Sequence, residues 1–572
     1  MPSNNSGYGS VAVNRSADEE KPLKALAPED SSVIHEGQRR QALGTTSRVF
    51  LSVLCVVACV ALFMGGDSEE SSLTMSAKHK HGKHKHKHHK NVLLDKHYDA
   101  QELYFDEQIL DHMDPSSDET WSERYYKVSK YWKGPGHPII VIMGGEDELI
   151  LPMLYPWVNK GLAKEFGAFV LSPEHRFYGA SQPFHNATNE ELVQLMTPDQ
   201  ALEDAVNLIQ YIRESIGCSL DKSSKDYCPV ITFGGSYPGF LSAMLRFRFP
   251  DVIDISYAAS APLDLYAQNV APQAYFDKVS EVAEIASPGC EAAVRDTLFD
   301  ARDELTTYYT SVKEAAELTG FCAKTFPDYM ETIEEFISET ITYLVPAVFA
   351  DFNMAYYPPG PKTALERACQ IFQDPIHAPL KKISLFYDLR GEVEYGADHK
   401  PECFDLTLEL PSGPNATIRG ADTSGSGGGF TGEIWEFQCC KDLIIRASYS
   451  EESMFIPRPY SPEFLQEHCQ ARFEGVPFKP DRMVREWGFD DLSQASRILF
   501  TNGLLDGWST SSILSTDNPN LAVINLPNGA HHSDLSMHWP NPADTDDIVE
   551  GHKQATVILQ GWLDDIKAEN SS

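Results

Sequence analysis

The chain has 572 residues, of which 42% are hydrophobic, enough for one large domain or two ordinary ones. Its formal net charge of −36 would repel phosphate, so we expect no nucleic-acid partner. This charge suits an acidic compartment, where some of the carboxylates are protonated.

The N-terminal region predicts a membrane anchor. The first 47 residues are polar and are predicted to be a disordered tail. Residues 49–64, VFLSVLCVVACVALFM, contain a single polar serine. Because a long polar stretch precedes this run, it does not resemble a cleaved signal peptide, and we expect a transmembrane signal anchor at 48–66. The expected protein crosses the membrane once and has a cytosolic N-terminus.

A basic tract follows the apolar run. Residues 78–90, KHKHGKHKHKHHK, contain six lysines and six histidines. One interpretation is a metal-binding or pH-sensing tract, and the other is a solvated stalk beside an anionic membrane. The stalk is favoured, because nothing in low-complexity sequence fixes the geometry of metal ligands.

Nine of the eleven cysteines follow the apolar run and form no Cys-x-x-Cys pairs. This distribution is typical of disulfide partners rather than zinc ligands, and the odd number leaves one cysteine over. We predict no metal site and no cofactor. Asn186 and Asn415 each begin an Asn-Ala-Thr sequence and are candidate glycosylation sites. Disulfides and glycans both require the secretory side, so residues 67–572 are expected to be lumenal or extracellular.

The next part of the chain predicts an α/β domain. Apolar runs at 137–149, 167–179 and 252–262 are predicted strands with their following loops, and 197–216 has a helical period. Residues 228–249 have the pattern of a strand, a turn and a helix. Strands that alternate with helices favour a mostly parallel sheet.

From about residue 265 to 490 the pattern is mainly helical. The glycine-rich stretch at 423–432 has no preceding strand and no following Lys-Ser/Thr, so it predicts a flexible loop rather than a phosphate-binding loop. The α/β pattern returns at 496–509 and 521–535, and a last helix is expected over about 552–567. One α/β domain is thus interrupted by a helical insertion of roughly two hundred residues, the size of a separate domain.

Three polar residues follow predicted strands in the order Ser236, Asp506, His531. In an open parallel sheet, sites form beyond the carboxyl ends of the strands, and this order is that of an α/β-hydrolase triad. A serine hydroxyl needs a neighbouring base, imidazole can accept its proton, and a carboxylate stabilises the imidazolium. His532 adjoins His531, and position alone does not decide which of the two is the base.

Ser236 lies in Gly-Gly-Ser-Tyr-Pro-Gly, where the usual fifth-position glycine is Pro238. A proline in the first helical turn loses no intrahelical hydrogen bond, and Gly239 can supply the close approach instead. The oxyanion hole would use the N–H of Tyr237 and a second donor from the loop after the first strand. We assign this second donor to Gly145, with Glu146 as the alternative. The alternative interpretation is an ordinary turn.

Motifs outside these residues add a resemblance. They are ILDHMDPSSDETWSERYYKVSKYWK (109–133), GGE (144–146), EHRFYG (174–179), FGGSYPG (233–239), WEFQCC (435–440), NGLLDGWS (502–509) and GAHHSDL (529–535). In this order they resemble the S28 serine peptidase family of prolyl carboxypeptidases, dipeptidyl peptidases and thymus-specific serine proteases. The resemblance covers about residues 98–567.

The resemblance implies an α/β-hydrolase fold with a large helical cap domain inserted between the nucleophile half and the Asp/His half. The implied activity is exopeptidase cleavage after proline, often at acidic pH, in an endosome, lysosome or vacuole. In the family's Gly-Ala-His-His motif the first histidine is the base, which selects His531. The implied partners are peptides with proline near a terminus, and a homodimer is an open alternative.

The sequence departs from the family pattern at three places. Pro238 replaces a glycine, Gly507 replaces a proline, and CCKD at 439–442 replaces Cys-Thr-Glu, so Cys439 is the expected extra thiol. A carboxypeptidase needs a donor-rich anchor for a terminal carboxylate, whereas a dipeptidyl peptidase needs carboxylates for a terminal ammonium. Glu146 is a candidate anchor, with a structural loop carboxylate as the alternative.

Trp435, together with Phe437, is a candidate wall for a proline pocket, although aromatic residues in a cap core are commoner. Two other functions stay open, an esterase or lipase on the same fold and a catalytically silent binding protein. The expected organisation is a tail at 1–47, an anchor at 48–66, a stalk at 67–97, the first hydrolase part at 98–264, the cap at 265–490 and the second hydrolase part at 491–567.

Overall fold

The computed structural model describes residues 94–95, 98–184, 187–324, 330–406, 431–536 and 538–570. The predicted tail, the His/Lys tract at 78–90 and the glycosylation candidates Asn186 and Asn415 lie outside these residues.

The predicted membrane location has to be corrected. Within the described ranges, no helix is long and apolar enough to cross a bilayer, and the predicted anchor at 48–66 lies outside them. Helix α19 (Asp546–Asn570) buries Ile548, Leu559 and Ile566 and exposes Val557. We therefore withdraw the single-pass membrane assignment.

The described strands form one nine-stranded sheet in the order β1-β2-β3-β5-β4-β6-β7-β8-β9. Strands β1 to β3 and the β3–β5 pair are antiparallel, whereas β5, β4, β6, β7, β8 and β9 run parallel. Their bounds are β1 Leu94–Asp95, β2 Ala100–Ile109, β3 Thr120–Val128, β4 Ile139–Ile142, β5 Phe169–Pro173, β6 Val230–Gly235, β7 Ile255–Ala259, β8 Ile498–Gly503 and β9 Ala522–Leu526.

The hairpin of β2 and β3 was not predicted. Its two strands pair from Gln101↔Lys127 to Ile109↔Thr120, with a bulge between Phe105 and Gln108. The burial pattern of β2 is irregular rather than strictly alternating, because the bulge changes which face the later side chains meet. The strand therefore lacks the alternation of apolar and polar residues by which a half-buried strand is recognised in a sequence.

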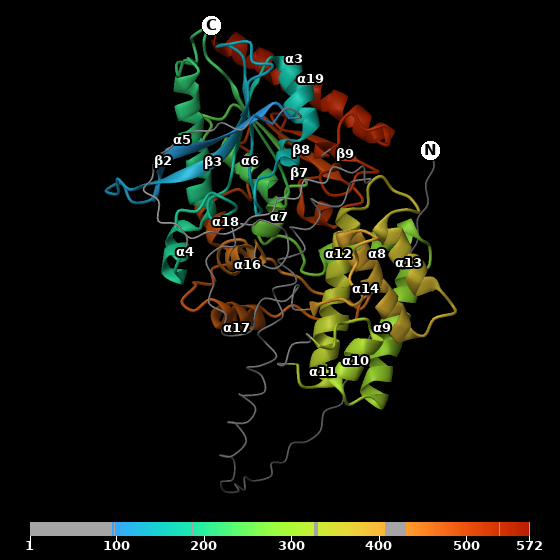
Figure 1. Cartoon of the computed structure of the whole chain (residues 1–572). Coiled ribbons are helices and arrows are strands. Elements are labelled where there is room, and N and C mark those ends of the chain that lie inside the picture. The colour runs from blue at the N-terminus through green and yellow to red at the C-terminus, as the bar shows by residue number, and fades with distance from the viewer. Residues whose placement is uncertain are drawn as a thin grey trace, which may run out of the picture. The chain divides into compact units, whose positions relative to one another are not determined.

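Helices cover both faces of the sheet, and alternate strand residues point into two separate cores. Ile139 and Val141 lie in the core under α5 (Pro198–Ser215) and α6 (Tyr237–Arg248). Ile140 and Ile142 lie in the core under α3 (Ala163–Phe166) and α19 (Figure 1). All four side chains are fully buried, which explains why the strand sequence is continuously apolar.

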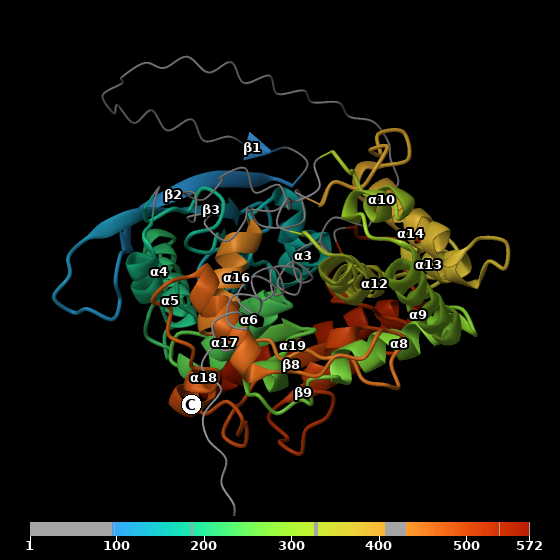
Figure 2. The ribbon, with the colours of Figure 1, turned by 90° about the horizontal axis from the view of Figure 1, so that it is seen from below.

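The helical insertion is confirmed between β7 and β8, which pair in the sheet although residues 260–497 separate them in the chain. Helices α8 to α14 group together, and α16 to α18 lie to one side of that group (Figure 2). Their bounds are α8 Ala274–Ala286, α9 Cys290–Tyr308, α10 Val312–Leu318, α11 Ile333–Phe336, η4 Ile337–Leu344, α12 Val345–Met354, α13 Ala364–Gln373, α14 Pro379–Tyr395, α16 Thr431–Lys441, α17 Pro462–Arg472 and α18 Arg482–Trp487.

The remaining helical elements are short and connect the strands. They are η2 Leu151–Leu154, η3 Trp157–Leu162, α4 Asn189–Leu195, α7 Leu263–Tyr266, η5 Gly507–Ser511 and η6 Ser533–Leu535. The fold is an α/β hydrolase with a large helical cap, as the sequence predicts. The exact domain boundaries stay a prediction.

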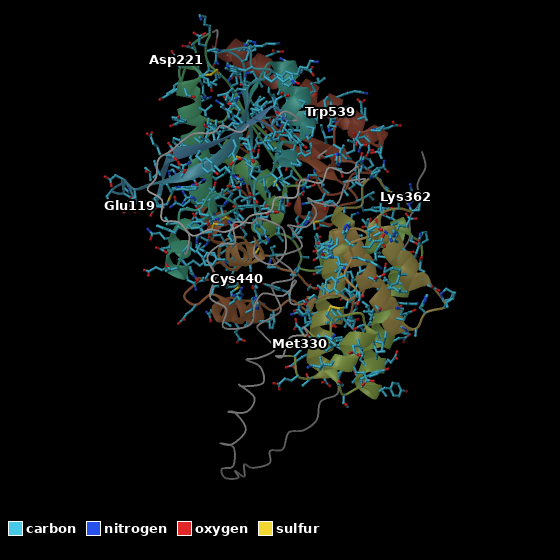
Figure 3. All side chains as sticks on the ribbon, in the orientation of Figure 1. Glu119, Asp221, Met330, Lys362, Cys440 and Trp539 are labelled. Carbon is cyan, nitrogen blue, oxygen red and sulfur yellow. A yellow bond between two sulfur atoms is a disulfide. The ribbon has the colours of Figure 1, made fainter. Side chains whose placement is uncertain are left out.

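Four disulfides hold the described part, and three of them lie in the cap. Cys290–Cys369 joins α9 to α13, and Cys440–Cys469 joins α16 to α17, with Cys440 labelled in Figure 3. The other two are Cys218–Cys228 and Cys322–Cys403. Cys439 is buried and belongs to none of the four, as predicted. Such a set of disulfides is typical of an oxidising environment.

Candidate active site

Ser236 occupies a sharp turn between β6 and α6. The strand ends at Gly235, the helix begins at Tyr237, and Ser236 between them has φ 61° and ψ −131°. A positive φ is unfavourable for serine, and such strain is found mainly at functional sites. The Ser236 N–H donates to the carbonyl of Ala259 at 2.9 Å, which ties the turn to β7.

The glycines around the serine are required by close packing. A Cβ on Gly234 would overlap the carbonyl of Pro238, and a Cβ on Gly239 would lie 2.8 Å from the Ala259 oxygen. Gly239 thus supplies the close approach that a glycine at position 238 would otherwise give.

Gly145 makes room for Pro238, the residue that replaces the family's usual glycine. A Cβ on Gly145 would overlap the Pro238 ring, so the loop after β4 lies directly on the turn after Ser236. Tyr237 is the first residue of α6, and a helix leaves its first N–H groups without intrahelical partners. The two predicted oxyanion donors, Tyr237 and Gly145, therefore belong to segments in contact.

Asp506 and His531 form a buried pair. His531 Nδ1 lies 2.7 Å from Asp506 Oδ2, and each side chain is 1% exposed. The other carboxylate oxygen, Oδ1, accepts the Trp508 N–H at 3.0 Å. His531 Nε2 is buried and has no hydrogen-bond partner among the described residues. The pair thus leaves one imidazole nitrogen available, in the arrangement that a general base needs.

The structure separates the two adjacent histidines. His532 has φ 35°, its N–H donates to Ser260 Oγ at 2.9 Å, and a Cβ on Gly235 would lie 2.7 Å from its Cγ. Burial, and then the nearby His531, hold the pKa of His532 well below its usual value. His532 therefore packs as a neutral ring behind the serine turn, while His531 contacts the carboxylate.

A buried hydrogen-bond network surrounds Tyr237. Its hydroxyl lies 3.0 Å from His175 Nε2 and accepts from Gln438 Nε2 at 3.3 Å. Tyr178 donates to Gln438 Oε1 at 2.7 Å. Trp435 lies beside the same ring, with centroids 5.3 Å apart. This network joins the EHRFYG stretch of the hydrolase part to the WEFQCC helix of the cap, which are two of the motifs that carry the resemblance.

The EHRFYG stretch is anchored by ion pairs on either side of His175. Arg176 donates to both oxygens of Asp204 at 2.6 Å, and Glu174 accepts from Arg124. Burial lowers the pKa of His175 to about 4, so the ring is neutral in its contact with Tyr237. The sequence analysis missed His175 and Gln438, and the only available signal was their place inside two quoted motifs.

Glu146 and Asp147 are buried beside Gly145. Burial raises the pKa of Glu146 to about 8 and that of Asp147 to about 7. Both residues are 3% exposed, and their carboxyl groups are neutral at acidic pH. Phe437, the second aromatic of the predicted pocket wall, is fully buried against Phe473, the residue that follows α17.

Comparisons with known proteins place this chain in a family. The fold is that of the α/β hydrolases, and the family described as Serine carboxypeptidase S28 matches residues 108–555. The chain therefore belongs to the S28 family of serine peptidases. Lysosomal Pro-X carboxypeptidase of Homo sapiens is 24% identical over 475 residues, covering 81% of this chain and 88% of that protein.

A protein of Arabidopsis thaliana named Probable serine protease EDA2 is 34% identical over 484 residues, covering 84% of this chain and 89% of that protein. Among solved structures, proline iminopeptidase of Mycobacterium smegmatis aligns over 78% of this chain and 96% of that chain, with 13% identity and a TM-score of 0.31.

Proposed function

We propose that this peptidase is an exopeptidase that hydrolyses the peptide bond after proline near a chain end. In the proposed triad, Ser236 is the nucleophile, His531 is the general base, and Asp506 is the carboxylate that orients and stabilises His531. The observation that carries the proposal is the buried 2.7 Å contact between His531 and Asp506, together with the strained turn that presents Ser236. All three residues follow strands of the same parallel part of the sheet.

The proposed reaction has two halves, formation and hydrolysis of an acyl enzyme, and each catalytic group acts in both. Ser236 Oγ attacks the carbonyl carbon as its proton moves to His531 Nε2, and Asp506 stabilises the imidazolium. The N–H groups of Tyr237 and Gly145 donate to the carbonyl oxygen, where negative charge develops. The protonated His531 then gives its proton to the leaving amine, and a water molecule hydrolyses the acyl enzyme by the same route.

Release of the C-terminal residue is the favoured polarity. The relatives named Pro-X carboxypeptidase support it, since they match along most of their length. The pKa of about 8 for Glu146 supports it too, because a neutral carboxyl can donate a hydrogen bond to a terminal carboxylate. Trp435, beside Tyr237, is the proposed wall of the proline pocket. Release of an N-terminal dipeptide is the second candidate, favoured by the acidic stretch at 146–148.

The test compares two reporters with the full chain and its Ser236→Ala variant, from pH 4 to 8. An N-blocked Pro-Xaa acid reports carboxypeptidase activity, and a free-amine Xaa-Pro amide reports dipeptidyl release. We expect cleavage of the first and no cleavage by Ser236→Ala. If only a simple ester is hydrolysed through Ser236, the proline-specific part of the proposal fails. If nothing depends on Ser236, the whole proposal fails.

A further inference from the structure

The cap contributes one polar side chain to the loop that carries Asp506. Asn353, on the last turn of α12, is fully buried. Its Nδ2 donates to the carbonyl of Leu505 at 2.9 Å, and its Oδ1 accepts the N–H of Gly507 at 2.8 Å. These two bonds hold the backbone on both sides of Asp506 from a single side chain.

The next residue of the same helix holds the other half of the pair. The carbonyl of Met354 accepts the N–H of His531 at 3.3 Å, and Met354 Sδ accepts from Trp508 Nε1 at 3.2 Å. One helical turn of the cap therefore contacts the loop of the acid and the loop of the base.

The residue at 507 makes this contact available. A proline there would have no N–H to donate to Asn353, whereas glycine supplies one. A larger residue is disfavoured as well, because a Cβ at 507 would lie 2.7 Å from the ring of Tyr275 on α8. Two cap residues therefore favour glycine at position 507, since Asn353 accepts its N–H and Tyr275 leaves no room for a side chain.

We propose that Asn353 is a positioning residue, which holds the Asp506 loop so that the carboxylate stays aligned with His531. The inference rests on the proposed function, since it gives the cap a part in building the catalytic pair. Asn353 itself touches no reacting atom. A shift of about 1 Å in catalytic geometry can cost roughly a hundredfold in rate, so loss of both bonds should lower turnover more than substrate binding.

The first experiment compares Asn353→Ala with a matched control, Ser280→Ala. Ser280, in α8, is also buried in the cap and makes the same pair of bonds to backbone, since it accepts from the Met454 N–H and donates to the Phe276 carbonyl. It does not contact the Asp506 loop through these bonds. Both variants lose one donor and one acceptor, so their losses of thermal stability should be similar.

The readout is the rate at which a fluorophosphonate labels Ser236. In this reaction the serine oxygen bonds to phosphorus, fluoride leaves, and the serine proton passes to His531, so the rate reports the triad independently of peptide specificity. We expect labelling by Asn353→Ala to be roughly tenfold to a hundredfold slower and labelling by Ser280→Ala to stay at the wild-type rate. On a peptide reporter, kcat should fall in Asn353→Ala while KM stays near its wild-type value.

Asn353→Asp keeps the test decisive if the alanine variant does not fold. A neutral aspartic acid still donates one hydrogen bond and accepts another, whereas the ionised form cannot donate and adds a charge beside Asp506. The variant should label at close to the wild-type rate at pH 5, and its rate relative to wild type should fall as the pH rises. The ionisable groups that face this turn include Tyr275, Asp351 with its partner Arg390, and the pair of Asp506 and His531, and all of them are present in both proteins. Their own titration is therefore common to both rates, and the ratio reports the group at position 353.

Equal labelling of Asn353→Ala and wild type would overturn the inference. Equal slowing of Asn353→Ala and Ser280→Ala would overturn it as well, because the loss would then reflect cap stability. Labelling of wild type that is unchanged by Ser236→Ala is a different result, which refutes the proposed function itself.

Discussion

At the scale of single residues, two neighbouring histidines have opposite environments. His531 contacts Asp506 at 2.7 Å and keeps Nε2 without a partner in the described structure, whereas His532 packs on Gly235 with a strongly lowered pKa. The same residue type therefore serves as proposed base at one position and as packing at the next.

The first prediction separates these two roles. His531→Ala should lower kcat by roughly 10⁴-fold or more, as expected when a triad member is removed. His532→Ala should retain most of the turnover and lose thermal stability, because it opens a cavity behind the serine turn. Ester hydrolysis and a melting curve for both variants measure this. The reverse order of activities would show that His532 is the base.

Glu146 provides the second prediction. Burial raises its pKa to about 8, so the carboxyl is neutral at pH 5. Glu146→Gln, which is neutral and of the same shape, should then leave kcat/KM on an N-blocked Pro-Xaa acid within about twofold at pH 5, since polar contacts of a neutral carboxyl and an amide differ little. A tenfold rise in KM for a free-amine substrate would instead show that Glu146 acts as a carboxylate for a terminal ammonium.

At the scale of elements, the turn from β6 into α6 and the loop after β4 fit one another. Pro238, the second residue of α6, costs the helix no hydrogen bond, and its ring fills the space that the missing Cβ of Gly145 leaves. A proline in the turn is thus compatible with the serine elbow only with a glycine in the facing loop.

The third prediction uses this fit. Gly145→Ala should lower kcat by roughly tenfold to a hundredfold, because the new Cβ pushes the proposed oxyanion loop away from Ser236. Adding Pro238→Gly should recover part of the loss by removing the ring that the Cβ meets. Activity of the single and double variants, with Pro238→Gly alone as the control, measures the coupling. No recovery in the double variant argues against direct packing of the two segments.

At the scale of the whole molecule, buried acids make stability depend on pH. The pKa of Glu339 and of Glu146 is raised to about 8, and that of Asp147 to about 7, in each case mainly by burial. Between about pH 4 and 8 the folded protein therefore binds more protons at these groups than the unfolded chain does. The contribution of these three acids to the free energy of unfolding then falls as the pH rises through this window. His175 and His532, whose pKa is lowered, contribute the opposite slope up to about pH 6.5.

The fourth prediction follows from that sign. The melting temperature should be higher at pH 5 than at pH 8, and Glu339→Gln should reduce the difference, since glutamine does not titrate. Glu334→Gln, at an exposed position of neighbouring α11, should leave the difference unchanged. Melting curves of the three proteins at both pH values measure this. A melting temperature that rises toward pH 8 contradicts the role given to the buried acids.

Much of this protein could be predicted from the sequence alone. The alternation of strands with helices, the helical insertion, and the order Ser236, Asp506, His531 depend on local periodicity and on chain order, and both are visible in one dimension. Cys439 as the cysteine outside the disulfides was accessible as well, because it is a departure within a recognised motif. The predicted membrane anchor was wrong. It was inferred from one apolar run, and no helix in the described part of the chain is long and apolar enough to cross a membrane.

The tertiary structure decided the rest. It distinguishes His531 from His532, because only one of two adjacent side chains can point at Asp506. It brings Asn353 to the Asp506 loop across about 150 intervening residues, and Gln438 to Tyr237 across about 200. No periodic pattern encodes contacts between such distant residues, because they form only when the cap packs on the sheet and buried polar groups must find partners. The elements are therefore local properties of this sequence, and the complete catalytic arrangement is a property of the packed fold.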